Sequence, residues 1–358
     1  MVSAYAWSVA LAGFAIGGVA GFVTQRSRLC SFGAIEDATV AGDTRRIRIF
    51  GLALGIAILF TQTLIVAGYL KPASTNYITS AIPWIGLLFG GLIFGLGMAL
   101  VGTCSFGSLV RLGSGDLRSL VVVLVFAATA LAILRGVLSG VRLSVFEAFP
   151  IRFASEISSD LPSVLGQALH ADLRLPLSIA IGGMLISFAA FHPRLRKSPR
   201  LLGAGVTLGL CIGLGWLATT ILADEFDGPS KPQSLTFVAP VGRAIFGALL
   251  APTTLIEFGV GSVLGVIAGS WLSAMRSNEF RWEAFDDQRE MRRHLGGAAL
   301  MGFGGILAGG CTIGQGLTAG SLLALSWPLA VAGMIVGARL GIVVLFEGSF
   351  RELVRRFL

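Results

Sequence analysis

The chain has 358 residues, of which 54% are hydrophobic and only 13% charged, and its formal net charge is +8. Several apolar runs exceed the roughly 18 residues that mark a membrane-spanning helix. These features predict one integral membrane protein and exclude a string of separate soluble modules. No basic surface interleaved with aromatic residues is visible, so a nucleic-acid partner is not expected.

Nine spanning helices are predicted in chain order, with four apolar stretches between them that are too short to cross a bilayer and too apolar for ordinary loops. We expect these four to be re-entrant half-helices. No Lys or Arg precedes the first apolar run, which is therefore interpreted as a retained helix and not as a cleaved signal peptide. The predicted spans are 7–24, 47–70, 81–101, 118–138, 173–192, 201–222, 255–275, 294–312 and 321–346, and the predicted half-helices are 29–41, 104–114, 237–252 and 311–320.

Part of the chain repeats itself. The run from Phe94 to Ser114 recurs from Met301 to Ser321, with Cys104 and Cys311 in register, so the offset is 311 − 104 = 207 residues. A third such run begins at Cys30, and its counterpart 209 residues later begins at Ala239, which has no thiol.

An odd number of crossings between the two halves would invert one relative to the other, as in many transporters. The predicted fold is an all-α polytopic membrane protein with an inverted pseudo-twofold repeat. A single transmembrane domain is expected over 1–358, with a first half at 1–140, a connector with the fifth span at 141–200, and an inverted second half at 201–358.

The distribution of basic residues predicts the orientation in the membrane. With the N-terminus outside, 19 of the 27 Lys and Arg residues fall in segments predicted to be cytoplasmic, and six fall outside. Because short cytoplasmic loops carry an excess of Lys and Arg, we expect the N-terminus outside and the C-terminus in the cytoplasm.

Three cysteines open predicted half-helices, each followed by Ser or Thr and, three positions on, by Gly. The N-terminus of a half-helix offers unpaired N–H groups and the positive end of a dipole, which favours an anion. A thiol adds a soft, weakly hydrated S–H donor, which suits a sulfur-bearing anion better than a hard phosphate. We therefore expect Cys30, Cys104 and Cys311 to contact a transported anion, and Cys211, inside a continuous helix, to be an inert buried residue.

Alternatives from other classes remain open at this point. A membrane thiol oxidoreductase would use the cysteines as redox pairs, but the sequence has neither a Cys-x-x-Cys pair nor a flavin or quinone signature. A Cu(I) channel would use soft thiol ligands, but the methionines form no series along a pathway. The scattered His170, His192 and His294 do not indicate a zinc site, and no metal or other cofactor is predicted.

Four runs resemble the YeeE/YedE family of bacterial inner-membrane sulfur transporters, some of whose members take up thiosulfate. The matching runs are Cys30-Ser31-Phe32-Gly33, Gly97-x-x-x-x-Gly102-Thr103-Cys104-Ser105-Phe106-Gly107, Gly309-Gly310-Cys311-Thr312-x-Gly314 and Ser234-Leu235-Thr236-Phe237-Val238-Ala239-Pro240.

This resemblance implies an hourglass-shaped transporter that passes thiosulfate between the thiols of Cys30, Cys104 and Cys311 through S–H hydrogen bonds, without enzymatic activity. It also implies a multi-pass protein of the bacterial inner membrane that works with a small TusA-like sulfur carrier in the cytoplasm. Other sulfur or selenium species are alternative substrates. From the predicted topology, an incoming anion would meet Cys311 first, Cys104 near the centre and Cys30 last.

Other polar residues are weaker candidates. Arg135 in the fourth span either guides the anion inward or extends to the outer face. Glu36 and Asp37 are expected to pair with Arg26 or Arg28, with a proton-coupled exit step as the alternative. Residues predicted to contact the substrate are Gly102, Thr103, Ser105, Gly107, Gly310, Thr312, Gly314, Gln315 and Arg135.

Overall fold

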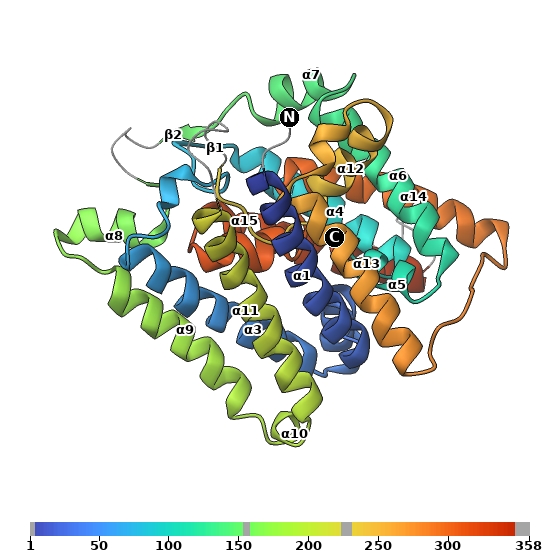
Figure 1. Ribbon diagram of the computed structural model, residues 1–358, viewed down its shortest axis with the longest axis horizontal. Helices are drawn as coiled ribbons and strands as arrows, with labels where there is room; N and C mark the ends of the chain where they lie inside the picture. Colours follow the sequence, from blue (N-terminus) through green and yellow to red (C-terminus); the bar gives the residue numbers. More distant parts are fainter. Residues whose placement is uncertain (1–3, 153–157, 223–230, 348–358) are drawn as a thin grey trace.

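The structure is a computed structural model that describes residues 4–152, 158–222 and 231–347, most of them helical (Figure 1). The elements of the first half are α1 (Ala4–Ser27), α2 (Ser31–Glu36), η1 (Asp37–Ala41), α3 (Arg45–Val66), η2 (Pro72–Ser74), β1 (Ala81–Ile82), α4 (Trp84–Val101), α5 (Ser105–Gly113) and α6 (Leu117–Leu134). The connector contains α7 (Ser139–Val141), η3 (Arg142–Phe146), β2 (Ile151–Arg152), α8 (Leu161–Leu169), α9 (Arg174–Ala190) and α10 (Pro193–Arg196). The second half contains α11 (Pro199–Ile221), α12 (Ala239–Leu249), η5 (Pro252–Leu255), α13 (Phe258–Arg276), α14 (Gln288–Leu307), η6 (Gly314–Ala319) and α15 (Ser326–Glu347).

Seven helical segments of the described chain are long and apolar enough to cross a membrane, which makes this a multi-pass membrane protein. They correspond to α1, α3, α4 with α5, α6, α11, α13 and α15. The other two predicted spans coincide with α9, which has 17 residues, and with α14, whose first turns carry several charged side chains. The predicted total of nine crossings stays a prediction.

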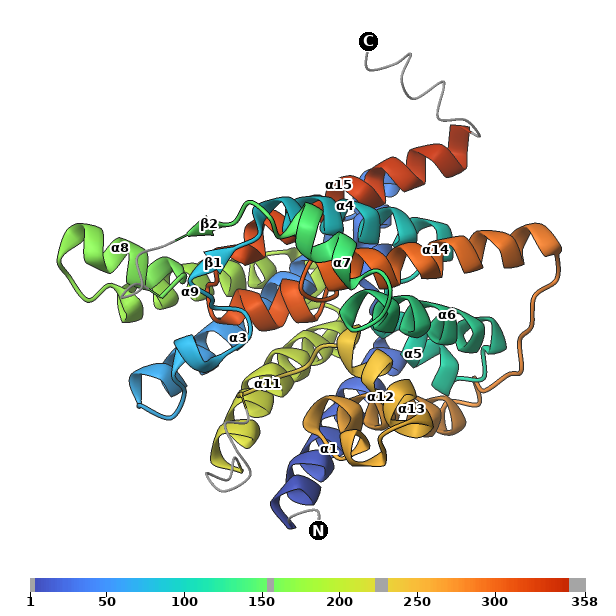
Figure 2. The same cartoon turned by 90° about the horizontal axis from the view of Figure 1, so that it is seen from above.

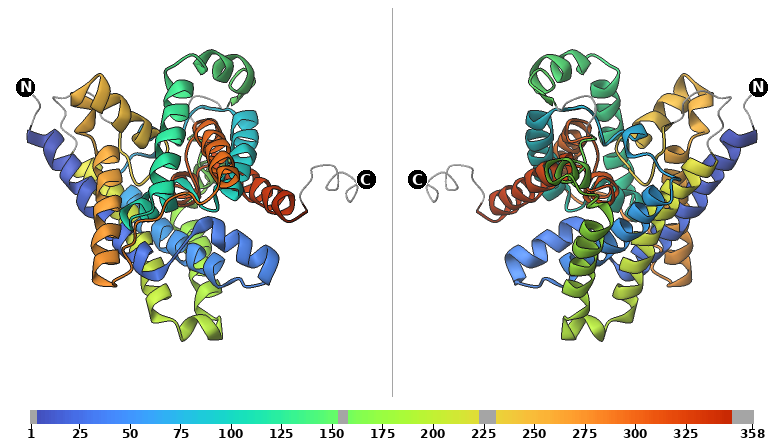
Figure 3. Two further views of the ribbon diagram at one scale, coloured as in Figure 1. Left: turned by 90° about the vertical axis from the view of Figure 1, so that its right-hand side faces the viewer. Right: turned by 90° about the vertical axis from the view of Figure 1, so that its left-hand side faces the viewer.

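The long helices pack in matching pairs. α1 lies against α13 and α3 against α11, while α4 lies against α15 and α6 against α14; α4 also contacts α14. α1 and α15 lie on opposite sides of the molecule (Figures 2 and 3). Glycine allows the closest approach: a Cβ at Gly17 of α1 would clash with the Ser262 carbonyl oxygen of α13. Small residues of this kind let helix backbones meet in lipid, where apolar burial gives little driving force.

The core is centred on the helices that surround α4 and α14. Phe94, Met98, Phe126 and Met301 are fully buried there. In a bilayer the same exclusion of polar groups forces backbone hydrogen bonds to close within helices, so any interrupted helix must lie inside the protein. The interruptions after α1, after α4 and after α14 therefore mark places where backbone polar groups are available to a ligand.

Each of the four stretches predicted to be half-helices contains a short helix. They are α2 with η1, α5, α12 and η6, and each follows a break in the chain. α4 ends at Val101 and is followed by Gly102, whose left-handed backbone (φ +76°) favours glycine; α5 begins three residues after Gly102, at Ser105. The repeated Gly-rich sequence thus produces an interrupted helix at the centre of the molecule.

The connector is tied to the second half by buried polar contacts. Arg174 Nη2 pairs with Asp160 Oδ2 at 2.7 Å, and Asp160 is fully buried. Arg174 Nη1 also donates to Gln62 Oε1, and Gln62 Nε2 donates to the Ser321 carbonyl oxygen. The two short strands β1 and β2 pair antiparallel, Ala81 with Arg152. These contacts connect α9 and α3 to the turn that follows η6.

Candidate functional site

Three of the four cysteines stand at the start of short helical segments, with the sulfur hydrogen-bonded to the backbone. Gly33 N donates to Cys30 Sγ at 3.5 Å, Gly107 N to Cys104 Sγ at 3.3 Å and Gly314 N to Cys311 Sγ at 3.4 Å. Each sulfur accepts a bond from the third following residue, as side-chain oxygens do at helix N-caps. The backbone therefore fixes the position of the sulfur and leaves its S–H proton free to donate to a ligand.

The glycine three residues after each of these cysteines leaves space for a neighbouring polar group. A Cβ at Gly107 would clash with Thr103 Oγ1, and a Cβ at Gly33 would lie 2.8 Å from Arg46 Nη1. At Gly314 the Cβ would clash with Thr236 Oγ1. A hydroxyl or guanidinium therefore lies beside every one of these three turns.

The three cysteine motifs converge at Cys104. Ser31 Oγ and Thr312 Oγ1 are 2.9 Å apart, and both hydroxyls lie beside the Cys104 thiol. Cys30 Sγ lies 3.7 Å from Thr103 Oγ1. Segments separated by up to 281 residues along the chain thus form one polar cluster inside an apolar fold.

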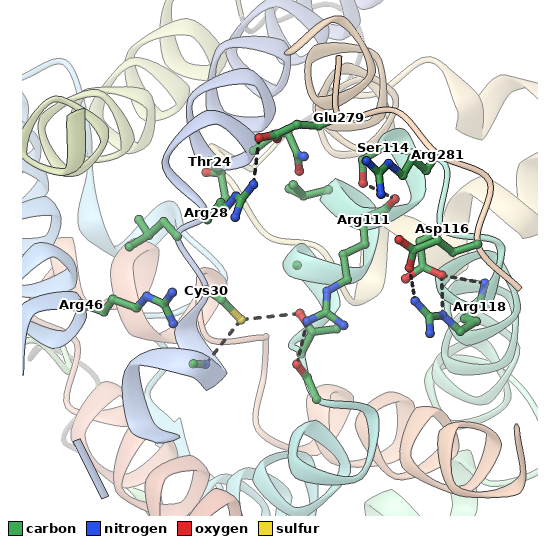
Figure 4. A pocket seen from close by; sticks show the side chains of 18 of the residues that line it. Thr24, Arg28, Cys30, Arg46, Arg111, Ser114, Asp116, Arg118, Glu279 and Arg281 are labelled. Atoms are coloured by element: carbon green, nitrogen blue, oxygen red, sulfur yellow. Dashed lines mark hydrogen bonds and ion pairs between the residues drawn. The ribbon is translucent and has the colours of Figure 1, made fainter. Parts of the chain in front are cut away.

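One cavity opens beside Cys30, and we call it the Cys30 cavity. It has a volume of about 560 Å³ and is bordered by the end of α1, by α5 and by the segment after α13. Figure 4 shows Arg111 in the middle of its lining, with Arg28 paired to Glu279 and Cys30 bonded to its neighbours. Its charged lining residues are Arg28, Arg46, Arg111, Arg118, Arg281, Glu36, Asp116, Glu279 and Glu283.

A second cavity, the Arg243 cavity, has a volume of about 390 Å³. It is bordered by Arg142 of η3, Arg243 of α12, Tyr77 and the Gly309–Gly310 turn that immediately precedes Cys311. Tyr77 lies near Thr236, and burial raises the pKa of Tyr77 above its ordinary value, so the phenol stays neutral and keeps its O–H donor.

The two cavities lie at opposite ends of α13. Arg243 pairs with Glu257, directly before α13, whereas Glu279 and Arg281 of the Cys30 cavity directly follow it. A helix of 19 residues is about 28 Å long. The buried Cys104 and Cys311 therefore lie between two cavities that open on opposite sides of the helix bundle.

Two buried polar atoms beside these thiols lack a protein partner. Ser105 Oγ and Gln315 Oε1 have no hydrogen-bond partner among the described residues, although both side chains are buried. An unsatisfied buried polar group costs about 1–3 kcal/mol. The Ser105 hydroxyl can donate to an anion, whereas Gln315 Oε1 only accepts and needs a donor such as water. Both residues belong to the predicted substrate-contacting set.

The structure brings most of the predicted site residues together. Gly102, Thr103 and Gly107 line the Cys30 cavity, and Gly310 lines the Arg243 cavity. Thr312, Gly314, Ser105 and Gln315 belong to the buried cluster between them.

Arg135 is placed apart from the thiols. It is exposed at the end of α6, lines neither cavity, and its guanidinium lies 5.7 Å from the centre of the Phe246 ring. A substrate contact at Arg135 stays a prediction. Cys211 is buried within α11, as expected for a residue without a break after it.

One expectation about the Cys30 motif is wrong. Asp37 pairs with Arg46 at 3.1 Å, and Arg28 pairs with Glu279, so the predicted pairing with Arg26 or Arg28 does not form. The reason is that α3 returns alongside α2 and places Arg46 nearer than the end of α1. Cys30 is half-buried beside its cavity, whereas Cys311 is fully buried.

Sequence reasoning missed Tyr77, Arg142 and Arg243 as parts of one site. Tyr77 and Arg142 lie in connections without periodicity, and nothing in the sequence relates them to each other. Thr236 belongs to the run 234–240, one of the four that resemble the family. That resemblance was the one indication in the sequence that this part of the chain contributes to the site. The arginines Arg351, Arg355 and Arg356, which entered the orientation prediction, lie outside the described residues.

In the described part of the chain, seven apolar helices, interrupted helices at the centre and two cavities that approach a buried polar cluster are the features of a polytopic transporter. The family model described as "Sulphur transport" matches residues 26–340. The chain therefore belongs to this family, the YeeE/YedE sulfur transporters.

Two curated relatives match almost the whole chain. The thiosulfate transporter TsuA of Escherichia coli (strain K12) is 28% identical over 341 residues, covering 92% of this chain and 93% of the relative. The thiosulfate transporter TsuA of Spirochaeta thermophila is 27% identical over 332 residues, covering 91% of this chain and 96% of the relative.

Proposed function

We propose that this protein takes up thiosulfate across the bacterial inner membrane by passing it between the thiols of Cys311, Cys104 and Cys30. The observation that carries the proposal is the line of backbone-bound thiols between two cavities at opposite ends of α13. Both TsuA relatives are named as thiosulfate transporters, which supports this substrate over other sulfur or selenium species.

The chemistry of the cluster suits a soft anion with one sulfur end and one oxygen end. The thiols offer S–H donors to the terminal sulfur of thiosulfate, while Ser31, Thr312 and Ser105 offer hydroxyls to its oxygens. None of these contacts is strong by itself, so the anion can leave each thiol for the next. A bound state that is favourable but weak at every step is what conduction through a narrow passage requires.

The proposed orientation places the N-terminus outside and the C-terminus in the cytoplasm. α1 then ends on the cytoplasmic side beside Arg28, so the Cys30 cavity is the exit and the Arg243 cavity the entrance. The matching helix pairs, α1 with α13 and α3 with α11, support an inverted repeat of the two halves 1–140 and 201–358. A TusA-like carrier in the cytoplasm is the proposed acceptor of the anion.

Two rival functions make different predictions. A thiol oxidoreductase would cycle its cysteines between free thiols and a disulfide during turnover, whereas a relay leaves all three as thiols. A Cu(I) channel would raise the copper content of cells and would be blocked by copper chelation.

The deciding experiment is uptake of radiolabelled thiosulfate into proteoliposomes that contain only this protein. We expect saturable uptake with unchanged free-thiol content and no dependence on copper. Saturable copper transport without thiosulfate uptake, or disulfide formation during turnover, would contradict the proposed function.

A further inference from the structure

The Arg243 cavity differs from the Cys30 cavity in the charge of its lining. Arg142 and Arg243 line the Arg243 cavity, and none of the described lining residues is acidic. The Cys30 cavity mixes five arginines with four carboxylates, although it is the larger of the two. Two guanidinium groups around about 390 Å³, without a carboxylate among them, create a positive potential that attracts a small dianion.

The acidic partners of the two arginines stand outside the cavity lining. Arg243 Nε donates to Glu257 Oε1 at 2.6 Å, and Arg142 Nη1 lies 3.6 Å from Glu147 Oε1. Neither glutamate lines the cavity. Each guanidinium has five N–H donors, so one carboxylate orients it and leaves other donors for a ligand.

Arg142 supplies the most specific observation. Its Nε is buried and has no hydrogen-bond partner among the described residues. A charged donor that is out of contact with water and without an acceptor is costly, and an oxyanion in the cavity would supply the acceptor. The neutral phenol of Tyr77, near Thr236, offers a further donor at the same cavity.

The cavity also contains the position at which the repeat lacks a thiol. Ala239 lines it, and Ala239 corresponds to Cys30 at an offset of 209 residues. No cysteine thiol is therefore available at the Ala239 position to recognise a ligand. Guanidinium groups bind oxyanions through charge and paired N–H bonds, so they do not distinguish thiosulfate from sulfate.

We propose that Arg142 and Arg243 form a thiol-independent binding site for small doubly charged oxyanions, which captures sulfate as well as thiosulfate before the thiols select for sulfur. The site deepens the proposed function, because it would be the entrance of the thiosulfate pathway. Sulfate should occupy it and compete with thiosulfate, but should not be passed to Cys311.

The test measures binding separately from transport. Isothermal titration calorimetry of sulfate and of thiosulfate is carried out on purified protein in which Cys30, Cys104 and Cys311 are all alanine. We expect both anions to bind with similar affinity. Arg142→Gln or Arg243→Gln in the same background should weaken binding of both by about tenfold or more.

Two control variants separate a binding role from a structural one. Glu257→Gln removes the partner of Arg243 but no cavity charge, so sulfate binding should be retained or tightened. Arg152→Gln removes an exposed arginine that lines neither cavity and should leave binding unchanged. Loss of binding in Glu257→Gln equal to that in Arg243→Gln would assign the arginine a structural role and overturn the proposal.

Transport kinetics give a second readout in the protein with all its cysteines. Arg142→Gln should raise the KM for thiosulfate about tenfold at an unchanged maximal rate, because the contact is made before the rate-limiting transfer. Sulfate should inhibit uptake competitively in the parent protein and much less in Arg142→Gln. Absence of sulfate binding, or binding that needs the cysteines, would refute the arginine site, whereas anion binding without thiosulfate uptake would refute only the proposed function.

Discussion

At the scale of single residues, the unusual feature is a sulfur atom in the place of a helix-capping oxygen. Ser, Thr, Asp and Asn are the usual N-cap residues because their oxygens accept strongly from the backbone. In this protein Cys30 and Cys104 cap α2 and α5, and Cys311 makes the same bond before η6. Sulfur is a weaker capping acceptor than oxygen, so its presence at these positions indicates a second role for the thiol. Contact between the S–H group and a soft anion is such a role.

The glycine three positions after Cys104 tests this geometry. Gly107→Ala would place a methyl group against Thr103 Oγ1, and the threonine would have to rotate or α5 to shift. Because α5 carries the bond to Cys104 Sγ, we expect thiosulfate uptake to fall at least about tenfold, as small displacements of a bound ligand typically cause. The matched control is Gly183→Ala, whose new Cβ would meet no atom within 4 Å and should leave uptake unchanged. Equal uptake in the two variants would show that the turn at Gly107 is not critical.

At the scale of elements, the sequence predicts the short helices well and their partners poorly. The Gly-Cys-Thr and Thr-Cys-Ser runs interrupt apolar stretches, and breaks of this kind are visible without a structure. The pairing of Asp37 with Arg46 is not visible, because it depends on how closely α3 returns beside α2. The Arg243 cavity is not visible in the sequence either. It forms because η3 and α12, which are about a hundred residues apart in the chain, lie next to the same cavity.

The buried ion pair between Asp160 and Arg174 is the second feature at this scale. Asp160→Ala leaves Arg174 without its carboxylate in a largely buried position, so we expect the free energy of unfolding to fall by about 3–5 kcal/mol. Chemical denaturation in detergent measures this loss. The double variant Asp160→Asn with Arg174→Gln, which removes both charges, should be more stable than Asp160→Ala. The control Asp286→Ala, at an exposed position, should change the free energy of unfolding by less than about 0.5 kcal/mol. An equally small effect of Asp160→Ala would show that this ion pair does not hold the connector in place.

At the scale of the whole molecule, the proposed pathway requires the Arg243 cavity to face outward and the Cys30 cavity to face the cytoplasm. Thr79, in the connection before α4, lies on the predicted outer side, and Arg289, at the start of α14, lies on the predicted cytoplasmic side. Both are exposed. In a variant with its native cysteines replaced, Thr79→Cys should react with a membrane-impermeant thiol reagent in intact cells. Arg289→Cys should react only after permeabilisation, and the reverse pattern would exchange the entrance and the exit.

The two ends of the proposed pathway differ in the charge of their lining. The Arg243 cavity has a net positive lining, so it concentrates anions, whereas the nearly balanced charges of the Cys30 cavity hold an emerging anion weakly. Between them the described cluster offers thiols, hydroxyls and the Gln315 amide, and the thiols favour a sulfur-bearing ion. Capture by charge, selection by thiols and weak retention at the exit suit uptake that is drawn onward by consumption of the anion in the cell.

The measurement that tests the central claim most directly is radiolabelled thiosulfate uptake by the alanine variants of the four cysteines, at equal protein level in the membrane. Cys104→Ala and Cys311→Ala should each abolish uptake, because the fully enclosed part of the passage has no other thiol donor. Cys211→Ala, buried in the continuous helix α11, should transport like the parent protein. Normal uptake in both Cys104→Ala and Cys311→Ala would contradict transfer of the anion between thiols.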